Sequence, residues 1–299
     1  MIASGFMPGK TTIVCVIGPT ASGKSARAVA IAKERNGEVI SVDSRQVYRM
    51  LDIGTEKTSN EEMDGIPHYL IDIRDPKDSY SAGDFIQDAA KLIEDISSRG
   101  KLPILAGGTH FYFDALLNGL PPEMPSDPKY REELEQLPTE ELARLIDEKD
   151  PLRAEHIDHS NRRRLVRALE IIEKHGAVPA RVPTTAYDVE WVVVDLERDE
   201  LRERITKRLQ SAFERGLIEE VRAVREYVGD ARLTELGLEY RIIGEYLRGE
   251  REESTLVPTL AAKLWQYARH QKQWLKKLVS SLTTALPVSP SNSDMQRVA

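Results

Sequence analysis

The segment that most constrains the fold of this chain is Gly18-Pro-Thr-Ala-Ser-Gly-Lys-Ser25. It follows a β-branched apolar run at residues 12–17 and precedes a helical pattern from Lys24 to Arg35. A strand, a glycine-rich turn and a helix in this order predict a phosphate-binding P-loop. The glycines let successive backbone N–H groups turn toward phosphate oxygens, and the helix N-terminus adds a partial positive charge.

The side chains of this motif indicate the same chemistry. Lys24 brings a full charge to the terminal phosphate, and the Ser25 hydroxyl can hold Mg²⁺. A surface turn with this spacing by chance is the alternative, and the flanking strand and helix argue against it. We therefore expect a di- or triphosphate group to bind here, held by Gly18, Thr20, Ala21, Ser22, Gly23, Lys24 and Ser25.

Length and composition limit the possible classes of protein. The 299 residues suit one large domain or two modest ones, and the formal net charge of −7 argues mildly against a nucleic-acid partner unless charge is clustered locally. The only cysteine, Cys15, excludes internal disulfides and cysteine zinc sites. No apolar run approaches the ~20 residues that span a bilayer. Residues 1–10 carry no apolar signal core, so we expect a cytoplasmic protein without a membrane segment.

Further strands are predicted after the P-loop helix. The strand Glu38–Val42 ends at Asp43, and the strand Leu102–Ala106 ends at Gly107-Gly108-Thr109. Because ligands of open α/β sheets gather at the carboxyl ends of strands, Asp43 and Thr109 are expected beside the phosphate site. The alternatives are that Asp43 only caps a helix and that the two glycines form a simple turn. Between them, residues 68–73 read as a third strand and Ser81 as the N-cap of a helix that continues to Ser98.

A helical segment interrupts this α/β pattern. Prolines mark a linker at residues 121–128, and residues 129–175 show charges at helical spacing without a convincing strand. A strand returns at Trp191–Leu196, so the helical segment is an insertion. We predict a P-loop NTPase-like parallel sheet flanked by helices, with a helical insertion domain and a helical C-terminal part. Its expected divisions are residues 10–122, the insertion 123–185, the return of the core at 186–282 and a disordered tail at 283–299.

Basic residues gather in two places despite the acidic total. The insertion contains the basic run from Asn161 to Glu170, and the last predicted helix, 256–279, interleaves basic and aromatic side chains. This mixture suits a phosphate backbone with exposed bases, while core packing is the alternative for the aromatics. Other helices are predicted at 199–215, where Arg204 and Arg208 share one face, and at 217–227 and 240–248.

The motifs do not favour an ordinary NTPase. Enzymes that hydrolyse ATP or transfer its phosphoryl group usually carry an apolar strand that ends in a Mg²⁺-binding Asp. Here the strand at residues 104–106 ends in glycines and Thr109, and Asp72 lies inside its predicted strand. Phosphate binding is therefore predicted more firmly than ATP chemistry.

Taken together, the motifs resemble those of the tRNA dimethylallyltransferases, the IPP transferase family. The resemblance spans about Val14 to Gln271. Its motifs, in register, are Gly18–Ser25, Asp43-Ser-Arg-Gln-Val-Tyr48, Leu51-Asp-Ile-Gly-Thr55, Pro67-His-Tyr-Leu-Ile-Asp72, Tyr80-Ser-Ala-Gly-Asp-Phe85, Gly107-Gly-Thr109 and Arg164-Leu-Val-Arg-Ala-Leu-Glu170.

The resemblance implies transfer of a dimethylallyl group from dimethylallyl diphosphate to N6 of adenosine 37, beside the anticodon of tRNA. The P-loop would then hold the diphosphate. Asp43 would accept the proton of the attacking amine, Thr109 would bind the bridging oxygen, and Lys24, Arg208 and Ser25-bound Mg²⁺ would neutralise the leaving group. A cytoplasmic monomer of bacterial type is implied, in which the tRNA anticodon arm contacts Ser44, Gln46, Arg162, Arg163, Lys272 and Lys276.

The chain departs from the family pattern at some positions. His110-Phe111 follows Gly-Gly-Thr where a glycine or methionine and then leucine are usual, and Leu264-Trp265-Gln266 replaces Thr-Arg-Gln. The segment Gly237–Arg241 only loosely matches the usual Gly-Tyr-Arg/Lys-Glu. Three alternatives stay open: prenylation of a free adenine nucleotide, a P-loop small-molecule kinase, and a non-catalytic RNA-binding protein. The basic insertion argues against the first of these, because a mononucleotide needs no such surface.

Overall fold

The computed structural model describes residues 10–121, 127–179, 181 and 186–285, with side chains described as far as Lys276. It forms two compact units. Unit 1 comprises the chain up to Phe113 and again from Ala186, and unit 2 comprises Asp114–Thr185.

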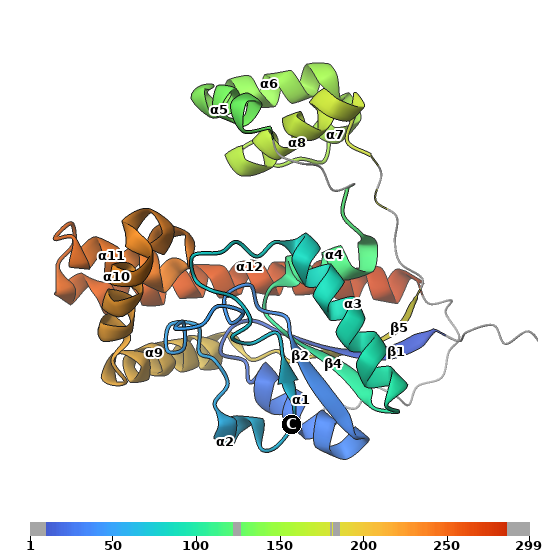
Figure 1. Ribbon diagram of the computed structural model, residues 1–299, viewed down its shortest axis with the longest axis vertical. Helices are drawn as coiled ribbons and strands as arrows, with labels where there is room; N and C mark the ends of the chain where they lie inside the picture. The colour runs from blue at the N-terminus through green and yellow to red at the C-terminus, as the bar shows by residue number, and fades with distance from the viewer. Residues whose placement is uncertain (1–9, 122–126, 180, 182–185, 286–299) are drawn as a thin grey trace, which may run out of the picture. The chain divides into compact units, whose positions relative to one another are not determined.

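Unit 1 is built on a parallel sheet of five strands (Figure 1). The strands are β1 (Thr11–Ile17), β2 (Gly37–Ser41), β3 (His68–Tyr69), β4 (Leu102–Gly107) and β5 (Tyr187–Val193), in the spatial order β3-β2-β4-β1-β5. The order places the P-loop strand between β4 and β5 and next but one to β2. The predicted α/β fold with a parallel sheet is confirmed.

Helices cover the sheet because parallel strands need crossover connections. Helix α1 (Lys24–Arg35) has the predicted limits and packs Ala28 and Ile31 against Val14 and Ile104 of the sheet. Helix α3 (Ala82–Ser98) packs against β2 and β4 (Figure 1). Ser81 is its N-cap, as predicted: the hydroxyl accepts the Asp84 N–H while Asp84 accepts the Ser81 N–H.

Two predicted strands have different limits in the structure. The third strand was expected over residues 68–73, but β3 ends at Tyr69 because Leu70 and Asp72 have left-handed backbone angles (φ 60° and 57°). A strand cannot continue through such residues. The last strand begins at Tyr187 rather than Trp191, since β5 pairs with β1 along its whole length, from Thr11 opposite Tyr187 to Ile17 opposite Val193.

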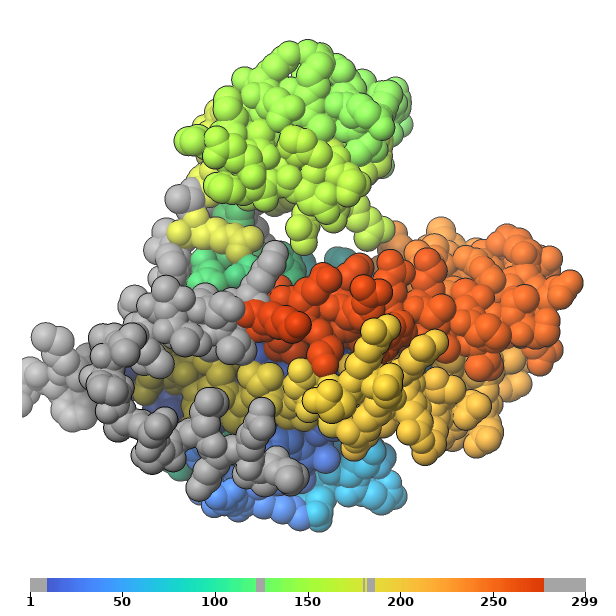
Figure 2. All heavy atoms as spheres, turned by 180° about the vertical axis from the view of Figure 1, so that it is seen from behind, coloured from blue at the N-terminus to red at the C-terminus, as the bar shows by residue number. Residues whose placement is uncertain are grey.

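The C-terminal part of unit 1 is helical, as predicted. It consists of α9 (Arg198–Glu214), α10 (Leu217–Glu235), α11 (Leu238–Leu247), a 3₁₀ turn at Glu253–Thr255 and α12 (Leu256–Ala285). Helix α10 is longer than predicted and is broken at Gly229. Figure 2 shows α9 and α12 side by side on one face of unit 1. The expected tail begins inside α12, which reaches Ala285, and residues 286–299 lie outside the described residues.

Unit 2 packs short helices around its own apolar core. These are α5 (Pro128–Gln136), α6 (Thr139–Lys149), α7 (Pro151–Ala154) and α8 (Arg162–His175), and α4 (His110–Asn118) leads into the unit from β4. Leu142, Ile146, Leu165 and Leu169 are fully buried there. Among the described residues of this unit the secondary structure is helical throughout.

A buried ion pair lies beside the core of unit 2. Glu170 is 3% exposed and accepts hydrogen bonds from Arg131 at 2.9 and 3.0 Å and from Arg167 at 3.3 Å. Arg167, part of the basic run, therefore pairs within its own unit. Across the residues that the structure describes in both units, no helix is both long and apolar enough to cross a bilayer.

Candidate active site at the strand ends

The carboxyl ends of β1, β2 and β4 meet at one edge of the sheet. Just after the end of β2, Val42 N–H donates to Ala106 O of β4 (2.8 Å), and Thr109 N–H donates to Val42 O (3.1 Å). Gly107 permits this closeness, because a Cβ there would lie 2.0 Å from Val42 O. The double glycine is thus more than a loose turn: it brings the segments that carry Asp43 and Thr109 together.

The P-loop adopts the geometry that its glycines predict. A Cβ on Gly18 would lie 2.2 Å from Val194 O, so only glycine lets the loop pass the end of β5. Gly23 has φ 92° and immediately precedes α1. Ala21 is also left-handed, at φ 62°, a strain that the sequence alone did not reveal.

Lys24 interacts with the other charged side chains of the site. Its Nζ donates to Pro19 O at 2.7 Å, across the loop. Burial lowers the pKa of Lys24 to about 8, helped by repulsion from Arg208 and opposed by Asp43. The lysine is therefore protonated at neutral pH, and Arg208 and Asp43 lie within its electrostatic reach. The structure thus brings these three predicted residues together.

The remaining P-loop side chains differ in exposure. Ser22 is 3% exposed, and its Oγ has no hydrogen-bond partner within the described part of the chain. A buried hydroxyl without a partner is costly, so a ligand that supplied one would be favoured here. Ser25, in the first turn of α1, is exposed and can reach a ligand or an ion.

Asp43 is half-buried and held by its own loop. Its Oδ1 accepts the N–H of Arg45 at 2.8 Å and the N–H of Gln46 at 3.3 Å. This oxygen therefore closes a turn at residues 44–47, and Asp43 does not cap a helix. Oδ2 accepts no hydrogen bond from any described residue, so one oxygen is left for other chemistry.

Thr109 ties the end of β4 to the loop of Asp43. Its Oγ1 accepts the Ser44 N–H at 3.0 Å and can donate to Ser44 Oγ at 3.5 Å. Gln46 is held more tightly: its amide donates to Thr55 O and Glu56 O and accepts from Ser41 Oγ. The side chain of Gln46 thus stabilises the loop, which leaves it little freedom to contact another molecule.

Gln271, on α12, is a site residue that the sequence analysis missed. It is 4% exposed; Oε1 accepts the Thr20 N–H and Nε2 donates to Gly108 O, each at 2.9 Å. One side chain therefore joins the P-loop to the end of β4 across 251 positions of sequence. No local pattern predicts such a contact.

Glu220, on α10, was missed for the same reason. Its carboxylate accepts the N–H groups of Asp52, Ile53 and Gly54 at 2.9, 2.6 and 2.9 Å and the hydroxyl of Tyr240 at 2.7 Å. Gly54 is required because a Cβ there would lie 2.7 Å from the same hydroxyl. This contact explains why the Leu51–Thr55 motif carries a glycine.

Other ionisable groups border the site. Burial raises the pKa of Glu239, which lies in the field of Arg208, Asp43 and Arg45. Tyr267 of α12 is 46% exposed, and partial burial with the negative charges of Asp43 and Glu239 raises its pKa to about 12. An exposed aromatic ring thus lies in the field of the Asp43 carboxylate, which argues against a pure core role for Tyr267.

The residues expected to contact RNA fall into two groups. Arg162 donates to Leu137 O at 2.5 Å and also to Leu134 O and Glu135 O, so it caps α5. Lys272 donates to Leu196 O and Asp195 Oδ1, both at 2.8 Å, and so fixes the segment after β5. These contacts make both residues weaker candidates for phosphate binding than expected. Arg163 is exposed and has no partner among the described residues, while Lys276 is exposed and has an interaction of its own.

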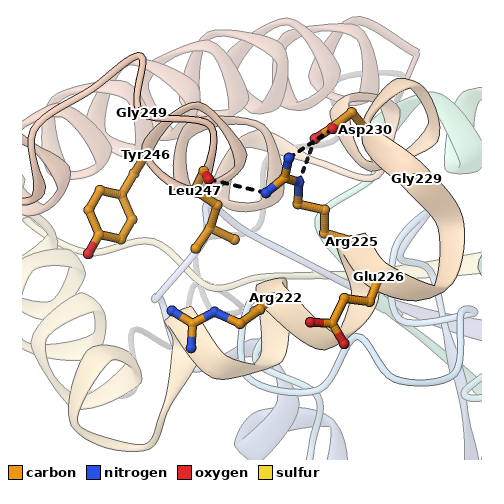
Figure 3. A pocket seen from close by; sticks show the side chains of 8 residues that line it. All are labelled: Arg222, Arg225, Glu226, Gly229, Asp230, Tyr246, Leu247 and Gly249. Carbon is orange, nitrogen blue, oxygen red and sulfur yellow. Dashed lines mark hydrogen bonds and ion pairs between the residues drawn. The ribbon is translucent and has the colours of Figure 1, made fainter.

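A pocket of about 660 Å³ lies between α10 and α11, apart from these residues (Figure 3). Arg225 projects into it and is held by Asp230 at 2.7 and 3.0 Å and by Leu247 O at 3.1 Å (Figure 3). Its lining includes none of the predicted site residues. The pairing of Arg225 indicates a structural role for this charge.

Comparisons with known proteins agree with this arrangement. The family model described as IPP transferase matches residues 46–278. A tRNA dimethylallyltransferase of Streptococcus pneumoniae (strain CGSP14) is 41% identical over 271 residues, which cover 89% of this chain and 90% of that protein. The tRNA isopentenylpyrophosphate transferase of Bacillus halodurans has a similar solved structure, with TM-score 0.68, 38% identity and coverage of 89% of this chain and 87% of that one. A eukaryotic dimethylallyltransferase, solved acting on tRNA, has TM-score 0.74 and 27% identity, and the match covers 89% of this chain and 70% of that one.

Proposed function

The chain belongs to the IPP transferase family, and from this we propose that it transfers a dimethylallyl group from dimethylallyl diphosphate to N6 of adenosine 37 in tRNA. The reaction forms a bond between N6 and the allylic carbon and breaks the bond from that carbon to the diphosphate oxygen. N6 loses a proton, and diphosphate is released.

The observation that carries the proposal is the convergence of Lys24, Arg208, Asp43 and Thr109 at the strand ends. Two cations beside a P-loop suit a diphosphate whose charge grows as the allylic bond breaks. A carboxylate within their reach suits removal of a proton from a weakly basic amine. The end of β4 carries glycines and Thr109 rather than the Mg²⁺-binding aspartate that is usual in ATP-dependent enzymes, and the aspartate at the end of β2 is Asp43.

Asp43 is proposed as the proton acceptor. The N–H groups of Arg45 and Gln46 hold Oδ1, which fixes the carboxylate and leaves Oδ2 for the N6 amine. Thr109 is proposed to donate its hydroxyl hydrogen to the bridging oxygen of the diphosphate, since its Oγ1 already accepts the Ser44 N–H and its proton is bound only weakly to Ser44 Oγ. Asp43 would then act on the attacking amine and Thr109 on the leaving diphosphate of the same displacement.

The P-loop amides, Lys24 and Arg208 are proposed to bind the diphosphate. The lowered pKa of Lys24 reflects a buried cation repelled by Arg208, and an anion between them would relieve that repulsion. Ser22 Oγ would gain the partner it lacks. Ground-state and transition-state binding differ here, because the diphosphate carries more charge as it leaves.

Mg²⁺ fits this site as a companion of the diphosphate. Among the described residues no group of three His, Cys, Asp or Glu side chains could hold a metal. The exposed Ser25 hydroxyl can supply one oxygen ligand, and Mg²⁺ commonly takes most of its other ligands from phosphate and water. When bound, the ion would neutralise part of the charge of the leaving diphosphate.

Unit 2 and α12 are proposed to contact the anticodon arm. Arg163 offers an exposed guanidinium without a protein partner in the described chain, and Tyr267 offers an exposed ring in the field of Asp43. The target base must leave its stack to reach a carboxylate inside a protein site. We propose that the reaction takes place in the cytoplasm, where a tRNA acceptor is present.

The test is transfer of radiolabel from dimethylallyl diphosphate to three acceptors: total tRNA, tRNA with adenosine 37 replaced by guanosine, and free AMP. We expect label in the first alone, dependent on Mg²⁺ and lost in Asp43→Asn. Labelling of AMP would favour the cytokinin-type alternative. Protection of the P-loop from proteolysis by ATP, without protection by dimethylallyl diphosphate, would favour the kinase.

A further inference from the structure

His110 follows Thr109 directly and occupies an unusual environment. The residue is 8% exposed, and its Nε2 is buried without a hydrogen-bond partner in the described part of the chain. Its backbone N–H donates to Gly108 O at 3.1 Å. Leaving a ring nitrogen buried and unpaired costs free energy, so the position calls for a reason beyond packing.

The ring is held in place from α12. His110 stacks on Trp274 with ring centroids 4.4 Å apart and an angle of 16° between the planes. One turn earlier on the same helix, Gln271 binds Thr20 N–H and Gly108 O. The stack and the amide thus hold His110 at the side of the P-loop rather than in a separate part of the core.

The nearest relevant charge is the P-loop lysine. A Cβ on Gly108 would lie 3.9 Å from Lys24 Nζ, and His110 is two residues further on. Burial and, to a smaller extent, the charge of Lys24 together lower the pKa of His110 to about 4. Lys24, on α1, is the charged group that acts on the ring, and Trp274, its stacking partner on α12, carries no charge.

We propose that His110 is an additional ligand of the substrate diphosphate. The diphosphate accepts a hydrogen bond from Nε2 of His110, and the imidazole takes up a proton when the diphosphate binds. The inference rests on the proposed function, in that the anion is the diphosphate of the P-loop. In the free protein the imidazole is neutral. An anion within hydrogen-bond distance favours the imidazolium and typically raises such a pKa by about 1–3 units.

The same anion offsets both features that keep the imidazole neutral in the free protein. It supplies an acceptor for an Nε2–H and compensates the Lys24 charge that opposes protonation. A hydrogen bond forms between Nε2–H and the anion, and no covalent bond of the substrate breaks. The proton that the ring takes up comes from solvent. The position next to Thr109 puts the resulting cation at the leaving group, where negative charge accumulates.

The experiment is calorimetric titration of inorganic diphosphate and of dimethylallyl diphosphate, with Mg²⁺, in buffers of different ionisation enthalpy at pH 6 and pH 8. Variants are His110→Phe, which keeps a flat ring to stack on Trp274, and His110→Gln, which keeps a donor that does not titrate. The matched control is His68→Phe. His68 also has a buried, unpartnered Nε2 and a pKa lowered by burial, but it lies on β3 at the far edge of the sheet.

At pH 6 we expect the wild type to take up between about 0.1 and 0.9 more protons than His110→Phe or His110→Gln, the range that a pKa raised from about 4 by 1–3 units implies. His68→Phe should match the wild type. Loss of the ring nitrogen should weaken binding by up to about ten-fold at pH 6 and less at pH 8, because a bond to a charged group is the stronger one.

Histidine NMR provides a readout that needs no folded variant. The chain has six histidines, and in the wild type one ring should shift its titration upward when diphosphate is added. Equal proton uptake in wild type and His110→Phe, with no histidine titration moved by diphosphate, would overturn the proposal while leaving the proposed function intact. Failure of dimethylallyl diphosphate to bind the wild type at all would instead remove the proposed function.

Discussion

Thr109 Oγ1 accepts the backbone N–H of Ser44 at 3.0 Å, so a side chain at the end of β4 fixes the loop that carries the carboxylate at the end of β2. Because strands β2 and β4 are neighbours, this single bond spans 65 positions of sequence. The group proposed to assist the leaving diphosphate thus also positions the group proposed to take the proton.

Thr109→Ser and Thr109→Val separate these effects. Serine keeps the hydroxyl and should retain most activity, whereas valine keeps the shape and should lower the transfer rate on the order of 10²–10³-fold, as loss of one donor to a developing charge does. Single-turnover rates with saturating tRNA measure the change. Equal rates for the two variants would mean that the hydroxyl has no part in the reaction.

Asp43→Asn should keep the fold and the affinity for dimethylallyl diphosphate. Its transfer rate should fall on the order of 10²–10⁴-fold, because an amide cannot take the proton of N6. The amide oxygen can still accept the Arg45 N–H, so the loop is preserved. Asp52→Asn, an exposed carboxylate paired with Lys57, is the control and should transfer normally. Rapid transfer by Asp43→Asn would assign the base elsewhere.

Gln271→Leu should destabilise the protein by about 1–3 kcal/mol, since it leaves the buried Thr20 N–H and Gly108 carbonyl without their partner. Thermal unfolding with and without inorganic diphosphate measures this loss. Gln266→Leu, on the exposed side of the same helix, is the matched control and should stay close to wild type. If both substitutions had the same small effect, the link between the P-loop and β4 would contribute little.

Arg163→Ala and Arg162→Ala should differ in kind. Removal of the exposed Arg163 guanidinium should raise the KM for tRNA and reduce the salt slope of binding by about 0.7–0.9, without loss of stability. Removal of Arg162 should lower the unfolding temperature, because three carbonyls at the end of α5 lose their donor. Filter binding over a salt series and thermal unfolding distinguish them. An unchanged salt slope in Arg163→Ala would place the RNA on another surface.

Glu38 should make unit 1 less stable to unfolding as the pH falls. Hydrogen bonds from Arg99, against the opposing effect of burial, and then from Lys101 and Tyr69 lower its pKa to about 2. The folded pKa lies below the unfolded value of about 4.3, so the contribution is complete above about pH 5 and is lost as pH falls toward 2. The unfolding temperature of Glu38→Gln should therefore fall less between pH 6 and pH 3 than that of the wild type. The exposed Glu190→Gln should follow the wild type.

Local patterns in the sequence predicted much of this molecule. The strand-turn-helix order around Gly18–Ser25, the Ser81 capping box and the glycines at the end of β4 are all short-range signals, and the structure agrees with them. The end of β3 was missed because left-handed angles at Leu70 and Asp72 are imposed by tertiary contacts, and neither residue type signals them.

Long-range partners could not be predicted in the same way. Gln271 and Glu220 are polar residues within helical patterns, and only the folded chain shows that they bind backbone groups of the P-loop edge and the Leu51–Thr55 loop. Lys272 was predicted to bind phosphate because the sequence shows its charge. The sequence does not show that this charge is paired with Leu196 O and Asp195 Oδ1. The roles of Asp43 and Thr109 remain predictions whose geometry the strand ends support.

The pairing of β5 with β1 has a consequence for synthesis of the chain on the ribosome. The P-loop strand emerges first, yet one of its two neighbours begins at Tyr187, after the whole of unit 2. Until then β1 has an unpaired edge of apolar residues, which is a template for pairing with other chains. Unit 2, with its own core, can become compact during that interval. A nascent chain released before Tyr187 should therefore contain a folded insertion together with four of the five strands, whose unpaired β1 edge is prone to aggregation.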